Sequence, residues 1–101
     1  MSAKTLHVVA RVSAKPDAAA QVAAILSKLI EPSRQEAGCV RYELFQNQSN
    51  PAELVFVEEW ADEAALNTHL ASAHLQSALN EAKPFLSKII DMRKYSVLEG
   101  A

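Results

Sequence analysis

The feature that most constrains the fold is the order in which two hydrophobic periodicities follow one another along the chain. Apolar side chains alternate, or form short runs, in residues 5–14, 39–48, 53–60 and 88–98, a pattern typical of β-strands. Segments with helical spacing separate them, at 17–37 and at 63–71 with 73–83. The order predicts a ferredoxin-like α+β fold, an antiparallel four-stranded sheet with its helices on one face and its first and third strands central.

Several residues are expected to begin or end the helices. We expect Asp17 to cap the helix over 17–37, because aspartate is a good N-cap. Pro32 lies inside that helix and should kink it or start a fresh turn, since proline has no backbone donor. Gly38 then occupies a natural C′ position. Asp62 and Ser72 are the expected caps of the helices at 63–71 and 73–83.

Alternation also assigns side chains to the two faces of the sheet. Residues expected to face the helices are Val8, Ala10 and Val12, then Val40, Tyr42 and Leu44, then Leu54, Phe56, Glu58 and Trp60. The other face would carry Val9, Phe45, Val55 and Val57, which a monomer would leave exposed. A contiguous apolar sheet face is usually a protein-contact site, so we predict a homodimer that forms a dimeric α/β barrel.

Length and charge narrow the class of protein. The 101 residues fit a single domain over 1–101. The formal net charge is −2, with acids and bases interspersed, which is unlike a nucleic-acid-binding surface. The sequence has no signal-peptide pattern and no apolar run of about 20 residues that could span a bilayer. We therefore expect a cytoplasmic protein with neither a nucleic-acid nor a membrane partner.

Common cofactor and metal motifs are not found in the sequence. Two glycines cannot build a phosphate loop or a dinucleotide fingerprint. His69 and His74 are five positions apart, which is the wrong spacing for one helix face, and a predicted cap lies between them. Cys39 is the one cysteine, so it has no CxxC partner and is expected to be an inert thiol. We predict no cofactor and no metal.

Two ionisable residues fall on faces that are otherwise apolar. His69 lies between Leu66 and Leu70 on the helix face that should meet the sheet. It is either a core histidine satisfied by one hydrogen bond or an acid–base group in a pocket. Glu58 shares a strand face with Phe56 and Trp60, so it needs a partner or a raised pKa.

The structural alternative for Glu58 is an ion pair with Arg34 or Arg93. His74 falls at the start of its helix, where a partly exposed side chain is as plausible as a functional one.

Three motifs then follow one another along the chain. They are Val8-Val9-Ala10-Arg11 with Lys15-Pro16, then Glu36-x-Gly38-Cys39-x-x-Tyr42-Glu43, then Glu58-x-Trp60 with Asp62-Glu63-x-x-Leu66-x-x-His69-Leu70 and Ser72-x-His74. As an ordered set they resemble the antibiotic-biosynthesis-monooxygenase family, from residue 5 to residue 97. The resemblance implies a dimeric α/β barrel with a pocket between the sheet and the helices of each subunit.

The resemblance also implies a chemistry. Several members oxidise phenols or quinols with molecular oxygen and without metal or flavin, whereas others degrade haem, act on small signalling molecules or have no established activity. The haem-degrading members carry an asparagine and a tryptophan at positions that look like Ala10 and His69, which argues against haem here.

The expected function is a cofactor-independent monooxygenase acting on a small aromatic substrate with molecular oxygen. His69 is the candidate catalytic base, because a histidine titrates near neutral pH. The candidate substrate-binding residues are Trp60, Glu58, Phe56, Tyr42 and His74. Two alternatives stay open: a non-catalytic dimeric barrel that binds a ligand or serves a stress response, and an isomerase acting on a small metabolite.

Overall fold

The sheet has the strand order that the sequence predicts. A computed structural model describes residues 4–99. Its strands β1 (Leu6–Ser13), β2 (Cys39–Gln46), β3 (Glu53–Trp60) and β4 (Asp91–Tyr95) form one antiparallel sheet in the order β2-β3-β1-β4. The first and third strands are therefore central, and the ferredoxin-like topology is confirmed.

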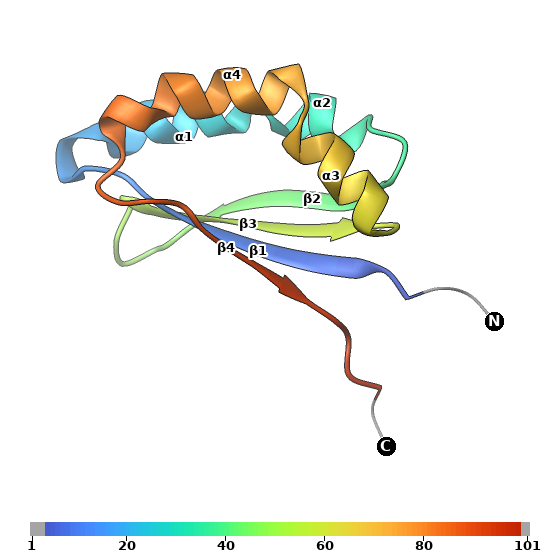
Figure 1. The fold of residues 1–101 in the computed structure, drawn as a ribbon. Helices are drawn as coiled ribbons and strands as arrows, with labels where there is room; N and C mark the ends of the chain where they lie inside the picture. Colours follow the sequence, from blue (N-terminus) through green and yellow to red (C-terminus); the bar gives the residue numbers. More distant parts are fainter. Residues whose placement is uncertain (1–3, 100–101) are drawn as a thin grey trace.

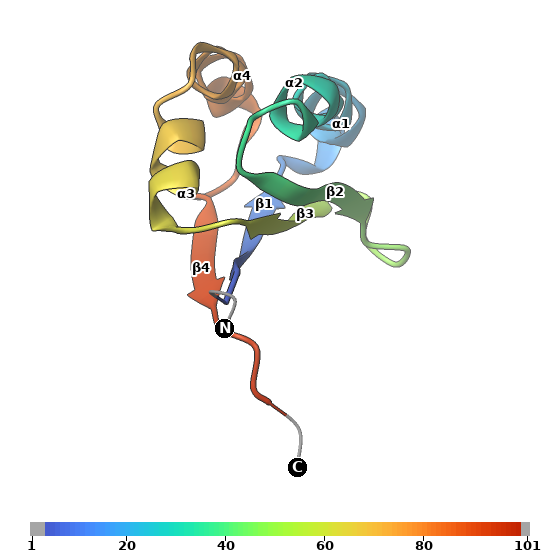
Figure 2. The same ribbon diagram turned by 90° about the vertical axis from the view of Figure 1, so that its right-hand side faces the viewer.

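All helices lie over the same face of this sheet (Figure 1, Figure 2). They are α1 (Ala19–Ser27), α2 (Ile30–Arg34), α3 (Glu63–Leu70) and α4 (Ala73–Ala82), with short 3₁₀ turns at Pro16–Ala18 and Lys83–Phe85. The side chains of Asp62 and Ser72 accept hydrogen bonds from the amides of Ala65 and Leu75, so both predicted caps are confirmed. None of the helices within residues 4–99 has the length and apolar character needed to cross a membrane.

The core fills the space between the sheet and the helices. Side chains alternate along β3 as predicted, with Leu54, Phe56, Glu58 and Trp60 buried. The buried apolar side chains opposite them come from the helices: Val22, Ile25, Leu26, Leu29, Leu66, Leu75, Ala78 and Ala82. Burying this apolar surface is the main source of stability, at roughly 25 cal/mol for each Å² removed from water.

The first helical segment is interrupted, and its predicted N-cap is wrong. α1 ends at Ser27 and α2 starts at Ile30, because Pro32 has no N–H to donate to the carbonyl of Lys28 one turn earlier. The fresh turn expected from the proline is therefore present. Asp17 instead lies inside the 3₁₀ turn, where the residue before the turn is Lys15 and no side-chain cap forms.

Gly38 is not a helix C′ residue, since α2 ends at Arg34 and no described glycine has a positive φ angle. It is instead a point of close approach. A Cβ atom at position 38 would overlap the Cβ atom of Ala65 on α3. The carbonyl of Gly38 also accepts a hydrogen bond from the amide of Ala61, at 2.8 Å. The connection between α2 and β2 therefore packs directly against the start of α3.

Two strand predictions need correction. The register between β2 and β3 shifts between Cys39 and Arg41, so the extra residue turns Val40 outward, where it is 56 % exposed rather than facing the core. The last strand covers Asp91–Tyr95 rather than 88–98. Its pairing with β1 ends at the His7↔Tyr95 pair, because β1 itself begins only one residue earlier, at Leu6.

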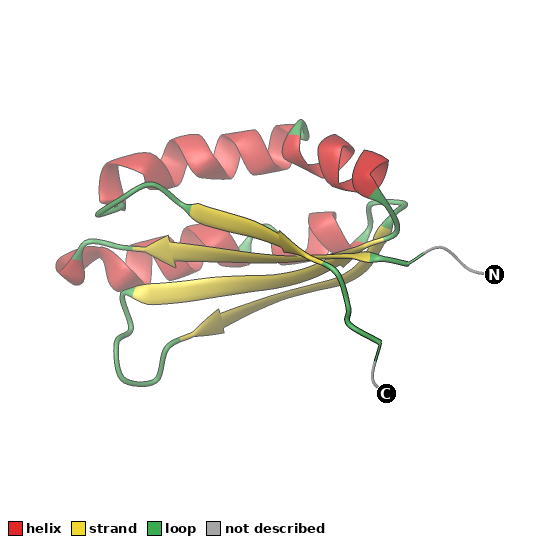
Figure 3. Cartoon of the chain, turned by 60° about the horizontal axis from the view of Figure 1, so that its bottom comes forward, coloured by secondary structure: helices red, strands yellow, loops and turns green. Residues whose placement is uncertain are grey.

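Within residues 4–99, no helix covers the second face of the sheet (Figure 3). Val9 and Val57 pair across β1 and β3 on this face and are partly buried, and Phe45 on β2 is 49 % exposed. Charged groups border the apolar strip, including an ion pair of Arg11 with Glu53 at 2.8 Å. Pairing of two subunits through this face remains a prediction.

Candidate functional site

A cavity of about 200 Å³ lies between the sheet and the helices. Most of its lining is apolar, including Ala10, Val12, Leu26, Leu29, Phe56, Leu70, Leu75, Leu79, Ile90 and Met92. The polar side chains in the lining are Tyr42, Glu58 and His69. Four of the predicted site residues therefore line one cavity. An apolar cavity with a few convergent polar groups is the usual form of a small-molecule site.

His69 is held rigidly within this lining. Its ring lies 4.5 Å from the Trp60 ring and 5.3 Å from the Tyr42 ring, measured between centroids. Its Nδ1 lies 2.7 Å from Oε2 of Glu36. Because an ionised carboxylate can only accept, we assign the proton to Nδ1, so this N–H donates. The lone pair of Nε2 is then left for the cavity, and Nε2 has no hydrogen-bond partner among residues 4–99.

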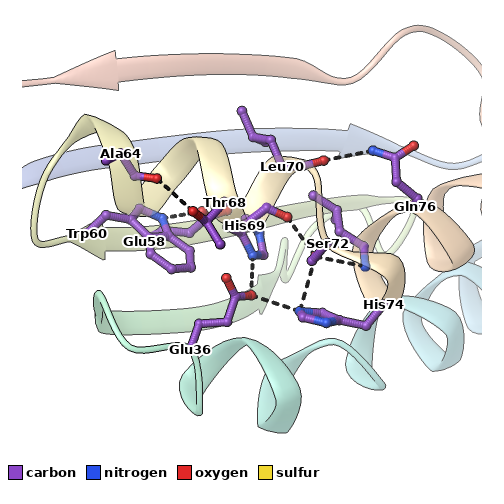
Figure 4. A network of polar contacts seen from close by, with 11 residues as sticks. Glu36, Glu58, Trp60, Ala64, Thr68, His69, Leu70, Ser72, His74 and Gln76 are labelled. Atoms are coloured by element: carbon purple, nitrogen blue, oxygen red, sulfur yellow. Dashed lines mark hydrogen bonds and ion pairs between the residues drawn. The ribbon is translucent and has the colours of Figure 1, made fainter.

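His74 contacts the same carboxylate oxygen as His69 (Figure 4). Its Nε2 lies 2.8 Å from Oε2 of Glu36. The two histidines do not share one helix face, as their five-residue spacing predicts, yet they converge on Glu36 from two helices. The chain turns at Ser72 between α3 and α4, so each histidine reaches Glu36 from its own helix. His74 and Trp60 are not part of the cavity lining. Trp60 is fully buried and packs against the His69 ring, and His74 is the more exposed of the two histidines that contact Glu36.

Glu36 was not among the predicted site residues. It stands 33 and 38 positions from the two histidines, so no local pattern reports the contact. Two local features place it. The amide of Cys39 donates to the carbonyl of Glu36 at 3.0 Å and closes a turn after α2. The close approach of Gly38 to Ala65 then presses this turn against α3.

Glu58 has a neighbour on its own strand as its partner. Its Oε1 accepts a hydrogen bond from Nε1 of Trp60 at 2.9 Å, so the expected ion pair with Arg34 or Arg93 is wrong. Arg34 donates to the carbonyl of Tyr42, and Arg93 pairs with Asp91. Burial raises the pKa of Glu58 to about 7, with the nearby charge of Glu36 adding to the rise and the Trp60 hydrogen bond opposing it.

The pKa of His69 moves in the opposite direction. Burial lowers it below the ordinary value of 6.5, and this effect outweighs the hydrogen bond and charge of Glu36, which raise it. The cavity thus contains a carboxyl group that holds its proton up to neutral pH and an imidazole that is neutral there. Such a divergence is how one site provides both a general acid and a general base. Burial raises the pKa of Tyr42, so its hydroxyl stays protonated.

Glu36, His69 and His74 also resemble a set of metal ligands. One ligand atom from each lies within 4.8 Å of the others, and two histidines with a glutamate are a known zinc set. In the arrangement described here, however, Oε2 of Glu36 faces a ring nitrogen of each histidine at hydrogen-bond distance. Both nitrogens would have to lose their protons before they could bind a metal. We therefore interpret the cluster as a hydrogen-bond network.

Residues 5–81 match the sequence model of a family described as antibiotic biosynthesis monooxygenase. The chain belongs to the antibiotic biosynthesis monooxygenase family. A relative from Mycobacterium tuberculosis, named "Putative monooxygenase Rv0793", is 37 % identical over 94 residues, which are 93 % of this chain and 92 % of the relative. The solved structure of Rv0793 has a TM-score of 0.88 and covers 96 % of this chain and 98 % of that one.

Two further relatives match most of the chain. "Putative monooxygenase YcnE" from Bacillus subtilis is 30 % identical over 90 residues, which are 89 % of this chain and 95 % of YcnE. The uncharacterized protein sll1783 from Synechocystis is 27 % identical over 92 residues. That match covers 91 % of this chain but only 63 % of sll1783.

Proposed function

We propose that this protein is a cofactor-independent monooxygenase that oxidises a small phenol- or quinol-type compound with molecular oxygen. The observation that carries the proposal is His69, a neutral imidazole fixed by Glu36 in an apolar cavity. A phenolate can pass an electron to oxygen without help from a cofactor. The protein must then bind the ring, remove one proton and exclude water.

In this proposal His69 acts as the base and Glu58 as the acid. His69 Nε2 takes the proton of the aromatic hydroxyl group, and oxygen then adds to a ring carbon to give a peroxide. Loss of water from the peroxide leaves a quinone. One oxygen atom of O₂ thus enters the product and the other leaves as water, so no outside reductant is needed. Glu58, protonated up to about pH 7, lines the same cavity and supplies a proton to the leaving oxygen.

The size of the cavity limits the substrate. An apolar cavity of about 150 Å³ in another protein holds benzene. The volume of about 200 Å³ here therefore favours a compound with one aromatic ring or a compact pair of rings. Phe56 and Tyr42 would flank the ring, and Trp60 would support it through His69.

The proposal includes a homodimer without metal or flavin, located in the cytoplasm. The uncovered strip of Val9, Val55, Val57 and Phe45 supports the dimer, since burying it in a second copy removes apolar surface from water.

One observation favours a second candidate, an isomerase. The Glu58 and His69 pair could move a proton between two positions of a keto compound as acid and base. No lysine or arginine appears among the described residues that line the cavity, so a phosphorylated substrate is disfavoured. A non-catalytic ligand-binding protein is the third reading.

Oxygen consumption separates these candidates. We expect the purified protein to consume oxygen when it is given one- and two-ring hydroquinones without added metal or flavin, and to form one quinone for each O₂. An isomerase would convert its substrate with no oxygen uptake. Binding of the same compounds with no conversion at all would favour the ligand-binding protein and count against both enzymes.

A further inference from the structure

We propose that Glu36 is a positioning residue that sets the tautomer of His69, and that His74 holds Glu36 in place for this task. The inference deepens the proposed function and rests on it for its catalytic consequence. The tautomer itself can be tested without any substrate.

The first support is the use of one carboxylate oxygen by two rings. Oε2 of Glu36 lies 2.7 Å from Nδ1 of His69 and 2.8 Å from Nε2 of His74. Since the carboxylate only accepts, both nitrogens must carry protons. For His69 this leaves the lone pair on Nε2, which is the form that a base facing the cavity requires.

The second support is an unsatisfied atom. Oε1 of Glu36 is buried and has no hydrogen-bond partner within the described residues. A buried polar atom without a partner destabilises a fold and is rare in native proteins. The cost of this unsatisfied oxygen has to be offset by the contacts that the carboxylate does make. These are the two hydrogen bonds at Oε2, to His69 and His74.

The third support is the order of exposure. The side chain of His69 is 2 % exposed, that of Glu36 14 % and that of His74 29 %. Exposure thus increases from His69 through Glu36 to His74, and Glu36 contacts both histidines (Figure 4). Glu36 lies in the short connection after α2, where its side chain could turn outward. The hydrogen bond from His74 on α4 closes that route and keeps the carboxylate facing His69.

The surroundings of His69 leave few other groups that could select its tautomer. The rings of Trp60 and Tyr42 pack against it from the sheet. The titratable groups that face it are Glu36, His74 and Tyr42, with Glu58 in the same cavity lining. Among these, Glu36 alone is within hydrogen-bond distance of the ring.

The test records imidazole ¹⁵N NMR spectra of the full chain, which distinguish protonated from unprotonated ring nitrogens. The chain has three histidines, so His7→Asn and His74→Asn each remove one set of signals and leave those of His69 assigned by elimination. In wild type we expect His69 protonated on Nδ1 alone near neutral pH. In Glu36→Leu, which removes the acceptor, the form protonated on Nε2 should become populated. Glu36→Gln keeps an acceptor oxygen, so it should largely restore the wild-type tautomer.

Kinetics provide the second readout. Loss of an outer partner that orients a metal-ligating histidine typically costs about 10- to 100-fold, and we take the same range for a histidine base. We expect Glu36→Leu to lower kcat by roughly that factor with little change in KM, and Glu36→Gln to lose less. Because His74 acts through Glu36, the double variant Glu36→Leu/His74→Leu should be no slower than Glu36→Leu alone. Glu31→Leu, which removes an exposed glutamate from α2, is the matched control and should change nothing.

The outcomes are separable. A wild-type tautomer in Glu36→Leu, or additive losses in the double variant, would overturn the positioning role. If Glu36→Leu does not fold, the NMR spectra of wild type and Glu36→Gln still test the inference. A wild-type His69 that is protonated on Nε2 would contradict it directly. If the tautomer follows Glu36 but His69→Gln keeps full activity, the positioning role stands and the proposed function fails.

Discussion

Nε1–H of Trp60 donates to Oε1 of Glu58, two positions away on the same strand and 2.9 Å distant. Residues i and i+2 of a strand share a face, so this partner comes with the strand itself. The hydrogen bond lets a buried carboxyl group avoid an ion pair. Burial then keeps the group protonated at a pH where an exposed glutamate is ionised.

This pair predicts how stability depends on pH. The pKa of Glu58 rises from 4.5 unfolded to about 7 folded. A raised folded-state pKa contributes stability that is fully present below pH 4.5 and lost as the pH rises through about 7. The loss amounts to roughly 3 kcal/mol at 1.36 kcal/mol per pKa unit. Glu58→Gln should lack this dependence, as measured by urea unfolding from pH 4.5 to 8.

The titration of His69 changes the free energy of unfolding with pH in the opposite direction. The effect of Glu58 therefore has to be measured as the difference between wild type and Glu58→Gln. The folded-state pKa of His69 lies below 6.5, so its contribution is present above pH 6.5 and lost as the pH falls through the folded-state pKa. The wild-type curve contains both effects. Only the difference between wild type and Glu58→Gln isolates the carboxyl group, and parallel curves would show that Glu58 titrates normally.

His69→Gln tests the catalytic role. Glutamine retains hydrogen-bonding groups but cannot transfer a proton near neutral pH. We expect turnover to fall by about 10²- to 10⁴-fold, the usual contribution of general acid–base groups, while the melting temperature changes little. His7→Gln, the same change on the uncovered face of the sheet, should keep full activity. The reverse pattern for His69→Gln, a lower melting temperature with normal activity per folded molecule, would mean that His69 is only a core residue.

Dimerisation can be tested by light scattering. A dimer should scatter as about twice the chain mass of 11.0 kDa. Val57→Asp should weaken association, because an unpaired buried charge costs several kcal/mol. Ala24→Asp, on the exposed side of α1, makes the same charge change away from the sheet and should leave the mass unchanged. A monomeric wild type at micromolar concentration would contradict the proposed pairing.

The proposal of metal independence predicts the effect of a chelator. We expect purified protein to be colourless and its activity to survive dialysis against EDTA. This follows from the proposed mechanism, in which His69 acts as a base while its Nδ1 is hydrogen-bonded to Glu36. Activity that EDTA removes and one metal restores would show that Glu36 and the histidines bind a metal instead.

The sequence predicts well those features that depend on local periodicity. The alternation in 53–60 places Phe56 and Glu58 inside, and the spacing of Leu66 and His69 places both against the sheet, as the structure has them. The caps at Asp62 and Ser72 follow equally local rules. These predictions succeed because neighbours within one turn or one strand decide them.

Other features depend on contacts between distant segments and could not be predicted. The register shift that turns Val40 outward arises in pairing with β3, not in the sequence of β2 itself. The contact of Glu36 with His69 depends on how α2 and α3 pack. The motif around Glu36 was visible within the family resemblance, but its spacing alone assigned Glu36 no role.

The close approach of Gly38 to Ala65 also predicts which substitutions the chain tolerates. Gly38 is only partly buried, so exposure alone would not mark the position as sensitive. Its backbone conformation suits any residue, yet even the methyl group of alanine would push the start of α3 away from the chain that carries Glu36. In a saturation library selected for activity, we expect position 38 to retain glycine while its exposed neighbour Ala37 accepts most residues.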